Sequence, residues 1–119
     1  MLRNIIAADN ARDLDRVMTY YTTDVVWAPP APRPEMRGFG AIRESYVRMY
    51  GEFSPQLEAS VETAIASDER AVVTGRTRGA LVPRAADAPA TQVNDNYEAI
   101  LRCERGHWRV ARLSWRPAS

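Results

Sequence analysis

The chain of 119 residues is 45% hydrophobic and 26% charged, which is typical of one soluble globular domain, expected over residues 1–119. Its 16 basic and 15 acidic side chains give a formal charge of +1 without a basic run, so nucleic acid is not an expected partner. One cysteine and one histidine predict neither a disulfide nor a metal or other cofactor, and no apolar run approaches the roughly 18 residues of a membrane span.

The start of the chain predicts two helices. Residues 1–6 lack the apolar run of a signal peptide, so we expect a cytoplasmic protein with no membrane partner. A short helix is predicted over residues 2–9, and a second helix begins with Asp13 as its N-cap. The apolar residues of this second helix recur with helical spacing, at Leu14, Val17, Met18 and Tyr21.

The next part of the chain predicts a strand, a loop and a third helix. The β-branched residues Val25 and Val26, followed by Trp27, favour a strand. Four prolines between residues 29 and 38 exclude regular structure there, because proline fixes φ and lacks an N–H group. A third helix is predicted over residues 39–53, with an apolar stripe that consists of Ile42, Tyr46, Met49, Tyr50 and Phe53.

The second half of the chain predicts strands. Apolar and polar residues alternate over 57–65, and a second strand over 71–81 follows a tight turn. Residues 92–104 and 108–115 predict another hairpin, closed by a turn at 105–107. The sequence therefore predicts an α+β fold, with three helices on one side of a sheet of four long strands and one short strand.

Three segments carry a resemblance to known proteins, namely residues 11–15 (ARDLD), 40–44 (GAIRE) and 106–112 (GHWRVAR). They resemble ketosteroid isomerases and the polyketide-cyclase, or SnoaL-like, branch of the nuclear transport factor 2-like superfamily. The resemblance implies a cone-shaped fold, in which three N-terminal helices pack on a strongly curved antiparallel sheet around one pocket. A pocket of this kind implies a small-molecule ligand.

The groups that a ketosteroid isomerase needs are missing from the corresponding positions. That family uses a general-base carboxylate after the first strand, a tyrosine on the first helix and a protonated acid on a late strand. By resemblance these positions fall at Pro29, Ile5 and Ala99. Tyr97 takes the third position if the hairpin slips by two residues. Because proline accepts no proton and isoleucine donates no hydrogen bond, steroid isomerisation by that mechanism is not expected.

Strand alternation, together with the resemblance, predicts which side chains face the pocket. The predicted inward residues are Val72, Thr74, Arg76, Arg78 and Ala80 on one strand, Val93, Asp95, Tyr97, Ala99 and Leu101 on the next, and Trp108, Val110, Arg112 and Ser114 on the last. Trp27, Tyr46 and Tyr50 would complete the wall. Buried charges persist only when they are paired or serve a ligand, so inward arginines predict a polar or anionic ligand.

The first functional hypothesis is an enzyme of isomerase, cyclase or hydrolase type that acts on such a ligand by acid–base chemistry. Asp95 is the candidate base, Tyr97 the candidate proton donor, and Arg112 or Arg76 the candidate holder of an anionic or enolate oxygen. The candidate substrate-binding residues are Trp27, Tyr46, Tyr50, Arg76, Arg78 and Ser114.

Two alternatives remain open. A slip of one residue would turn every strand side chain to the other face, and the arginines would then be solvated or lie at a dimer interface. The second alternative is a non-catalytic ligand-binding or accessory protein that forms a homodimer through the outer face of the sheet. The predicted apolar residues of that face are Ile100, Ala111, Leu113 and Trp115.

Overall fold

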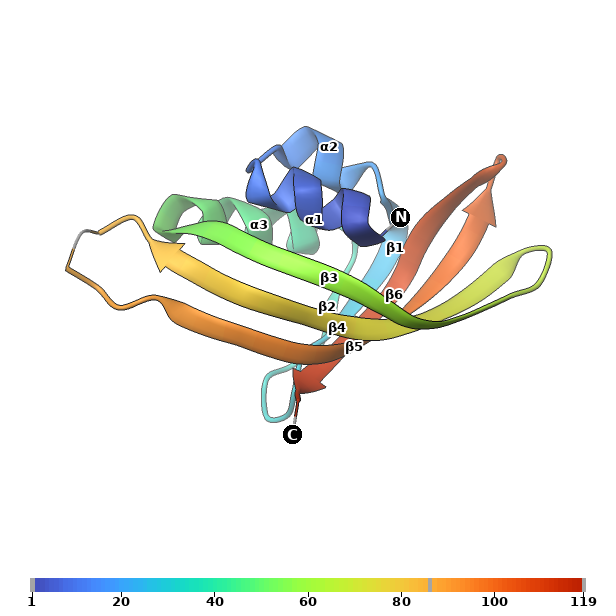
Figure 1. Ribbon diagram of the computed structural model, residues 1–119. Coiled ribbons are helices and arrows are strands. Elements are labelled where there is room, and N and C mark those ends of the chain that lie inside the picture. Colours follow the sequence, from blue (N-terminus) through green and yellow to red (C-terminus); the bar gives the residue numbers. More distant parts are fainter. Residues whose placement is uncertain (1, 86, 119) are drawn as a thin grey trace.

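The computed structural model describes residues 2–85 and 87–118. Helices cover one face of a curved sheet, and the long strands bend around them (Figure 1). The helices are α1 (Leu2–Asn10), α2 (Leu14–Met18) and α3 (Phe39–Glu52). The strands are β1 (Tyr21–Ala28), β2 (Met36–Arg37), β3 (Phe53–Ala66), β4 (Arg70–Pro83), β5 (Thr91–Glu104) and β6 (His107–Pro117). The predicted α+β fold, with its N-terminal helices on a mostly antiparallel sheet, is confirmed.

The six strands of the described residues form one sheet in the order β2-β1-β6-β5-β4-β3. β1 and β6 pair in parallel, and the other neighbours pair antiparallel. β3, β4 and β5 hold 14 residues each, so they extend beyond the part of the sheet that the helices cover (Figure 1). The hydrophobic core lies between the helix layer and the inner face of the bent sheet.

Local sequence explains where α2 begins and ends. The Asp13 carboxylate accepts a hydrogen bond from the Arg16 N–H at 3.2 Å, which confirms the predicted N-cap. The helix ends at Met18, and Tyr21 is the first residue of β1 rather than the last of the helical stripe. β-branched residues directly after Tyr21 favour extended structure, and this preference shortens the helix.

The proline-rich segment contains one short strand that the sequence does not predict. Met36 and Arg37 form β2 and pair with Trp27 and Val26 of β1. The four prolines of this segment all precede Met36, so β2 keeps the N–H groups that pairing needs.

The side chains of β4 face the opposite way to the prediction. Ala71 and Val73 are buried, whereas Val72 is 38% exposed, so the odd-numbered residues face the helices. β5 follows the prediction, because Tyr97 and Ala99 are buried. Small residues such as Ala71 on the inner face weaken the alternation of large apolar side chains from which a strand face is predicted.

A β-bulge reverses the prediction for the second half of β6. Two consecutive residues of β5 pair with Val110 and Arg112, so Ala111 is an extra residue in the ladder. Val110 is buried as predicted. Beyond the bulge, Leu113 and Trp115 pack against the core and not on the outer face, where the prediction places them.

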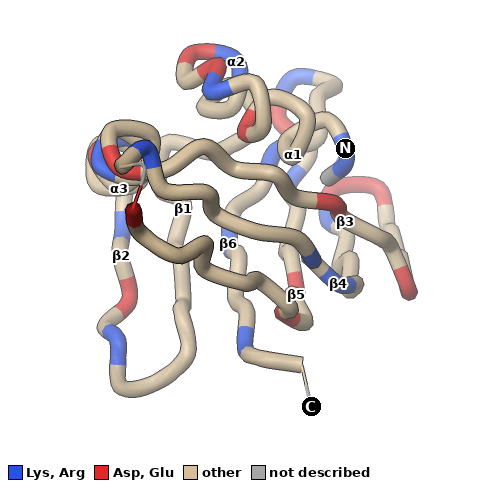
Figure 2. The backbone as a smooth tube through the Cα atoms, turned by 60° about the vertical axis from the view of Figure 1, so that its left-hand side comes forward, with Lys and Arg blue, Asp and Glu red and all other residues tan. Residues whose placement is uncertain are grey.

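Charged residues of both signs are spread along the backbone (Figure 2). Over residues 2–85 and 87–118, no helix has both the length and the apolar character that crossing a membrane requires.

Candidate functional site

A cavity of about 230 Å³ lies between the helix layer and the inner face of the sheet. Most of its wall is apolar, with side chains such as Ile5, Met49, Leu57 and Leu113. The polar groups in the wall are few, and they include the carboxyl group of Asp9. An apolar cavity with a small number of polar groups is the usual form of a small-molecule site.

Four residues of the predicted site line this cavity, namely Trp27, Tyr46, Asp95 and Tyr97. Tyr50 lies beside them, with its ring centroid 5.6 Å from that of Tyr46. The alternation predicted for β5 is what brings Asp95 and Tyr97 to the cavity. Their positions agree with the prediction, and their chemical roles stay a prediction.

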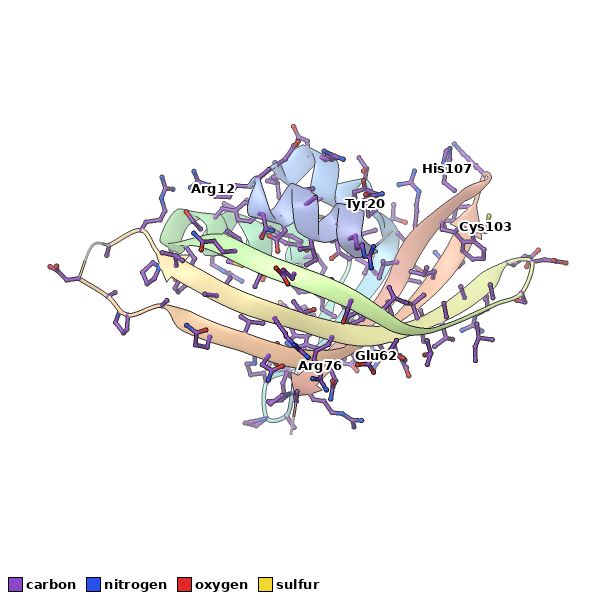
Figure 3. All side chains as sticks on the ribbon, viewed as in Figure 1. Arg12, Tyr20, Glu62, Arg76, Cys103 and His107 are labelled. Atoms are coloured by element: carbon purple, nitrogen blue, oxygen red, sulfur yellow. The ribbon has the colours of Figure 1, made fainter. Side chains whose placement is uncertain are left out.

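The predicted arginines and Ser114 are not among the residues that line the cavity. Arg76 lies on the outer face of the sheet (Figure 3). Together with Ser114 it lines a separate hollow there. Arg112 pairs with Glu35 on the surface at 2.9 Å, and Arg78 is exposed. The register of β4 and the bulge in β6 turn these side chains outward. An anionic ligand held by arginines inside the cone is therefore not supported.

The hairpin of β5 and β6 ends away from the cavity. Trp108, which alternation predicts to point inward, lines a different hollow together with Tyr20. His107 is exposed at the tip of the hairpin, near Cys103 (Figure 3). These residues take no part in the cavity wall.

One residue of the site, Asp9, is absent from the predicted set. It is 5% exposed in the last turn of α1, and its Oδ1 accepts a hydrogen bond from the Tyr50 hydroxyl at 2.8 Å. Burial raises the pKa of this carboxyl from 3.8 to about 6, and the hydrogen bond from Tyr50 acts in the opposite direction. One signal is present in the sequence: Asp9 follows Ile5 by four residues, so both share one face of α1.

Asp95 supplies the second carboxyl group of the cavity. It lies on β5 and is partly buried, and burial raises its pKa against the opposing charge of Arg33. Tyr97 is 6% exposed, and its hydroxyl donates a hydrogen bond to the Ser60 carbonyl at 2.8 Å. The Tyr97 proton is therefore directed to the backbone of β3.

Aromatic side chains form one wall of the cavity. The hydroxyl groups of Tyr21 and Tyr46 lie 2.8 Å apart, and burial raises the pKa of both, so both remain neutral. The Trp27 ring packs edge-to-face, with its centroid 5.1 Å from that of Tyr46 and 5.5 Å from that of Trp115. Trp27 Nε1 is buried without a hydrogen-bond partner among the described residues.

A family model, the SnoaL-like domain, matches residues 2–111. The chain belongs to the SnoaL-like domain family. Its match covers the helix layer and most of the sheet, and it ends before Leu113 and Trp115 of the cavity wall. No curated protein matches the chain.

Solved structures resemble this SnoaL-like domain over nearly its whole length. A ketosteroid isomerase-like protein from Erwinia carotovora atroseptica is 24% identical, with 98% of this chain and 89% of that chain covered and a TM-score of 0.84. A conserved protein from Planctomyces limnophilus is 18% identical, with 97% of this chain and 90% of that chain covered and a TM-score of 0.87. An NTF2-like protein of unknown function from Shewanella oneidensis is 18% identical, with 96% of this chain and 91% of that chain covered and a TM-score of 0.75. These similarities confirm the nuclear transport factor 2-like fold, and a shared fold leaves the activity to be argued from the site.

This SnoaL-like domain places its carboxyl groups differently from the ketosteroid isomerase pattern. Ile5 lines the cavity at the position where that resemblance expects a tyrosine. Asp9, one turn further along α1, brings a carboxyl group into the helix side of the wall instead. Among residues 2–85 and 87–118, no group of three or more His, Cys, Asp or Glu side chains is placed to hold a metal ion.

Proposed function

We propose that this SnoaL-like domain is a cofactor-free enzyme of isomerase, cyclase or hydrolase type that moves a proton on a small organic molecule. One observation supports this above the others: Asp9 and Asp95 bring two carboxyl groups with raised pKa values into one largely apolar cavity. A carboxyl group whose pKa lies near the working pH is an efficient general acid or base.

The two carboxyl groups come from different layers of the fold. Asp9 belongs to the helix layer and Asp95 to the sheet, so a molecule in the cavity meets a proton-exchanging group on each side. The Tyr50 hydroxyl holds Oδ1 of Asp9 and orients the carboxyl before a ligand arrives. Asp95 keeps its role as candidate base, and Asp9 becomes the second acid–base group.

The size of the cavity limits the substrate. Its volume of about 230 Å³ is smaller than the roughly 300 Å³ at which sites for drug-sized ligands begin. Its wall is mostly apolar. We therefore expect a compact, largely apolar substrate with only one or two polar groups.

Exchange of carbon-bound hydrogen tests the proposal even before the natural substrate is identified. Small ketones, including amino ketones, are incubated with the protein in D₂O, and loss of the C–H signal is followed by NMR. We expect the protein to speed exchange for at least one compound. Asp9→Asn and Asp95→Asn should each slow that exchange about 100-fold or more, the usual contribution of a general acid or base.

Asp15→Asn is the matched control, because it removes an exposed carboxyl group from α2, outside the cavity. It should leave the exchange rate unchanged. Equal exchange rates in the wild type and in both cavity variants would contradict the proposal.

A second candidate function is that of a non-catalytic accessory protein that acts as a homodimer through the outer face of the sheet. Ile65 and Val72 pair across β3 and β4 on that face and are 74% and 38% exposed. Beside them, Arg76 Nε is buried without a partner among the described residues, in a hollow that also contains Glu98. A two-fold axis through this face would bring the arginine of one copy near the glutamate of the other.

A further inference from the structure

Over residues 2–85 and 87–118, the wall of the cavity contains acidic side chains and no basic one. It includes Asp9 and Asp95 but no Arg, Lys or His side chain. Among the described residues, neither of these carboxyl groups forms a salt bridge. The positive charge of Arg33 acts on Asp95, and that of Arg3 acts on Tyr97. Both arginines are exposed and lie outside the lining of the cavity.

A carboxyl group in this situation favours a cationic ligand. Removing a carboxylate from water without a partner disfavours its charged form, and the raised pKa of Asp9 reflects this cost. A cation inside the cavity would supply the missing partner and stabilise the ionised carboxylate. An anion would add a like charge at close range and would be repelled.

The aromatic wall adds a second attraction for a cation. The rings of Tyr21, Trp27, Tyr46 and Trp115 all line the cavity. Trp27 lies at their centre. Its ring centroid is 6.1 Å from that of Tyr21 and closer still to those of Tyr46 and Trp115. The charge of Asp9 acts on two of these rings, Tyr21 and Tyr46. The negative faces of aromatic rings attract organic cations, and rings beside an acid are a common means of recognising ammonium groups.

We infer that the cavity binds a small organic amine or ammonium compound, with Asp9 as its counter-ion and Trp27 and Tyr46 as its aromatic walls. This inference rests on the proposed function, because it names the substrate class of the same cavity. Asp95 then remains available to exchange a proton with the bound molecule. With an amine bound, Asp9 holds the charge and Asp95 performs the proton transfer, whereas an uncharged ketone leaves both acids free to exchange protons.

Three aromatic probes of similar size and different charge test the inference, namely benzylammonium, benzyl alcohol and benzoate. The protein is labelled with ¹⁵N at tryptophan, and its three indole N–H signals are followed during titration. Trp27 and Trp115 line the cavity, whereas Trp108 lies in another hollow and serves as an internal control. We expect benzylammonium to shift Trp27 and Trp115 alone, and to bind about tenfold or more tightly than benzyl alcohol. Benzoate should shift neither signal.

Asp9→Asn is the critical variant. It keeps an oxygen that accepts the Tyr50 hydrogen bond and removes the charge, so it should lose most of the preference for benzylammonium over benzyl alcohol and keep only what the aromatic wall and Asp95 contribute. Asp15→Asn, on the exposed side of α2, should keep the wild-type preference. An unchanged Trp108 signal in each variant shows that the fold is retained.

The pH dependence gives an independent readout. Binding of the amine requires the ionised form of Asp9, whose pKa is about 6, so its affinity should rise about tenfold between pH 5 and pH 7. The neighbouring tyrosines Tyr21, Tyr46 and Tyr50 have raised pKa values and stay neutral over this range. The other acids that bear on this region are Asp13 and Asp95. Asp9→Asn should flatten the dependence.

The outcomes separate the inference from the proposed function. If benzyl alcohol or benzoate binds as tightly as benzylammonium, the amine inference is overturned while the cavity remains a ligand site. If no probe shifts Trp27 or Trp115 but ketones still exchange deuterium, the inference is again overturned and the proposed function stands. If the wild type prefers benzylammonium but speeds deuterium exchange for none of the ketones, the proposed catalysis is overturned and the binding site remains.

Discussion

Asp9 shows how one residue sets the chemistry of the cavity. Its neighbours on the buried face of α1 are apolar, and the residue sits at the negative end of the helix dipole. Both conditions oppose a negative charge, and among the described residues the Tyr50 hydroxyl alone favours it. A buried acid of this kind lowers stability at neutral pH, which is a common property of groups that serve function rather than folding.

Asp9→Asn should therefore stabilise the protein at neutral pH. The carboxyl titrates near 3.8 when unperturbed and near 6 in the folded chain, so the folded chain binds more protons between these values. Stability consequently falls as pH rises through this window, and the deficit above pH 6 is up to about 3 kcal/mol. Urea unfolding should show the variant to be more stable near pH 7.5, with a difference that shrinks below pH 4. A difference independent of pH would contradict this explanation.

At the scale of the elements, a close approach of β3, β4 and β5 fixes Tyr97. A Cβ atom at Gly75 would overlap the Ser60 carbonyl oxygen and the Tyr97 hydroxyl. These two groups form the hydrogen bond that anchors Tyr97 in the cavity wall. Glycine at this position lets an aromatic ring of β5 cross β4 and reach β3.

Gly75→Ala should destabilise the protein by about 1–3 kcal/mol, because backbone and ring must both move to admit the methyl group. Gly40→Ala is the control: Gly40 lies in α3, and an added Cβ would meet nothing within 4 Å. That change should be neutral or stabilise by up to about 1 kcal/mol. Thermal unfolding of the two variants measures the contrast, and similar melting temperatures would argue against it.

The sequence predicts where helices and strands lie better than it predicts which side chains of a strand face the core. The helix spacing and the Asp13 cap place α2. The alternation in β5 places Tyr97 and Asp95, because polar residues such as Asn96 and Glu98 separate the buried ones there. In β4 both faces carry aliphatic residues of similar size, such as inward Val73 and outward Val72, so size does not mark the buried face. In β6 the composition does not reveal the extra residue Ala111. It shifts the pairing of β6 with β5, but the sequence around it still looks like an ordinary strand.

Asp9 illustrates a different limit of sequence-based prediction. An acid near the end of a short helix is usually solvated or forms a cap, and nothing local distinguishes it from those cases. Its burial depends on Tyr50 of α3 and on the sheet, which approach α1 only in the folded molecule. A contact 41 residues away in sequence gives it its environment.

At the scale of the whole molecule, the two faces of the sheet differ in character. The inner face encloses the cavity, and the outer face exposes Ile65 and Val72 beside a hollow with charges of both signs. Adjacent exposed aliphatic residues with complementary charges nearby favour association of two copies. A dimer formed in this way would leave the cavities free.

We expect the protein to sediment as a dimer and Ile65→Arg to sediment as a monomer, because a charge at the centre of the apolar patch cannot be buried without a partner. Val47→Arg is the control: Val47 is another exposed aliphatic residue, 47% exposed on α3, away from this face. It should leave the sedimentation coefficient unchanged. A monomeric wild type would remove the support for the accessory-protein candidate.

The extra residue at Ala111 has an evolutionary consequence. Strand alternation that continued from Val110 through Ala111 without a bulge would bring Arg112 and Ser114 to the cavity in place of Leu113 and Trp115. Loss of the Ala111 codon, in contrast, would remove the bulge and leave the apolar, aromatic lining unchanged. The bulge thus lets β6 hold one more residue than its partner strand without a change of lining, so an inserted residue alters the ligand class only where the strand pairs it regularly.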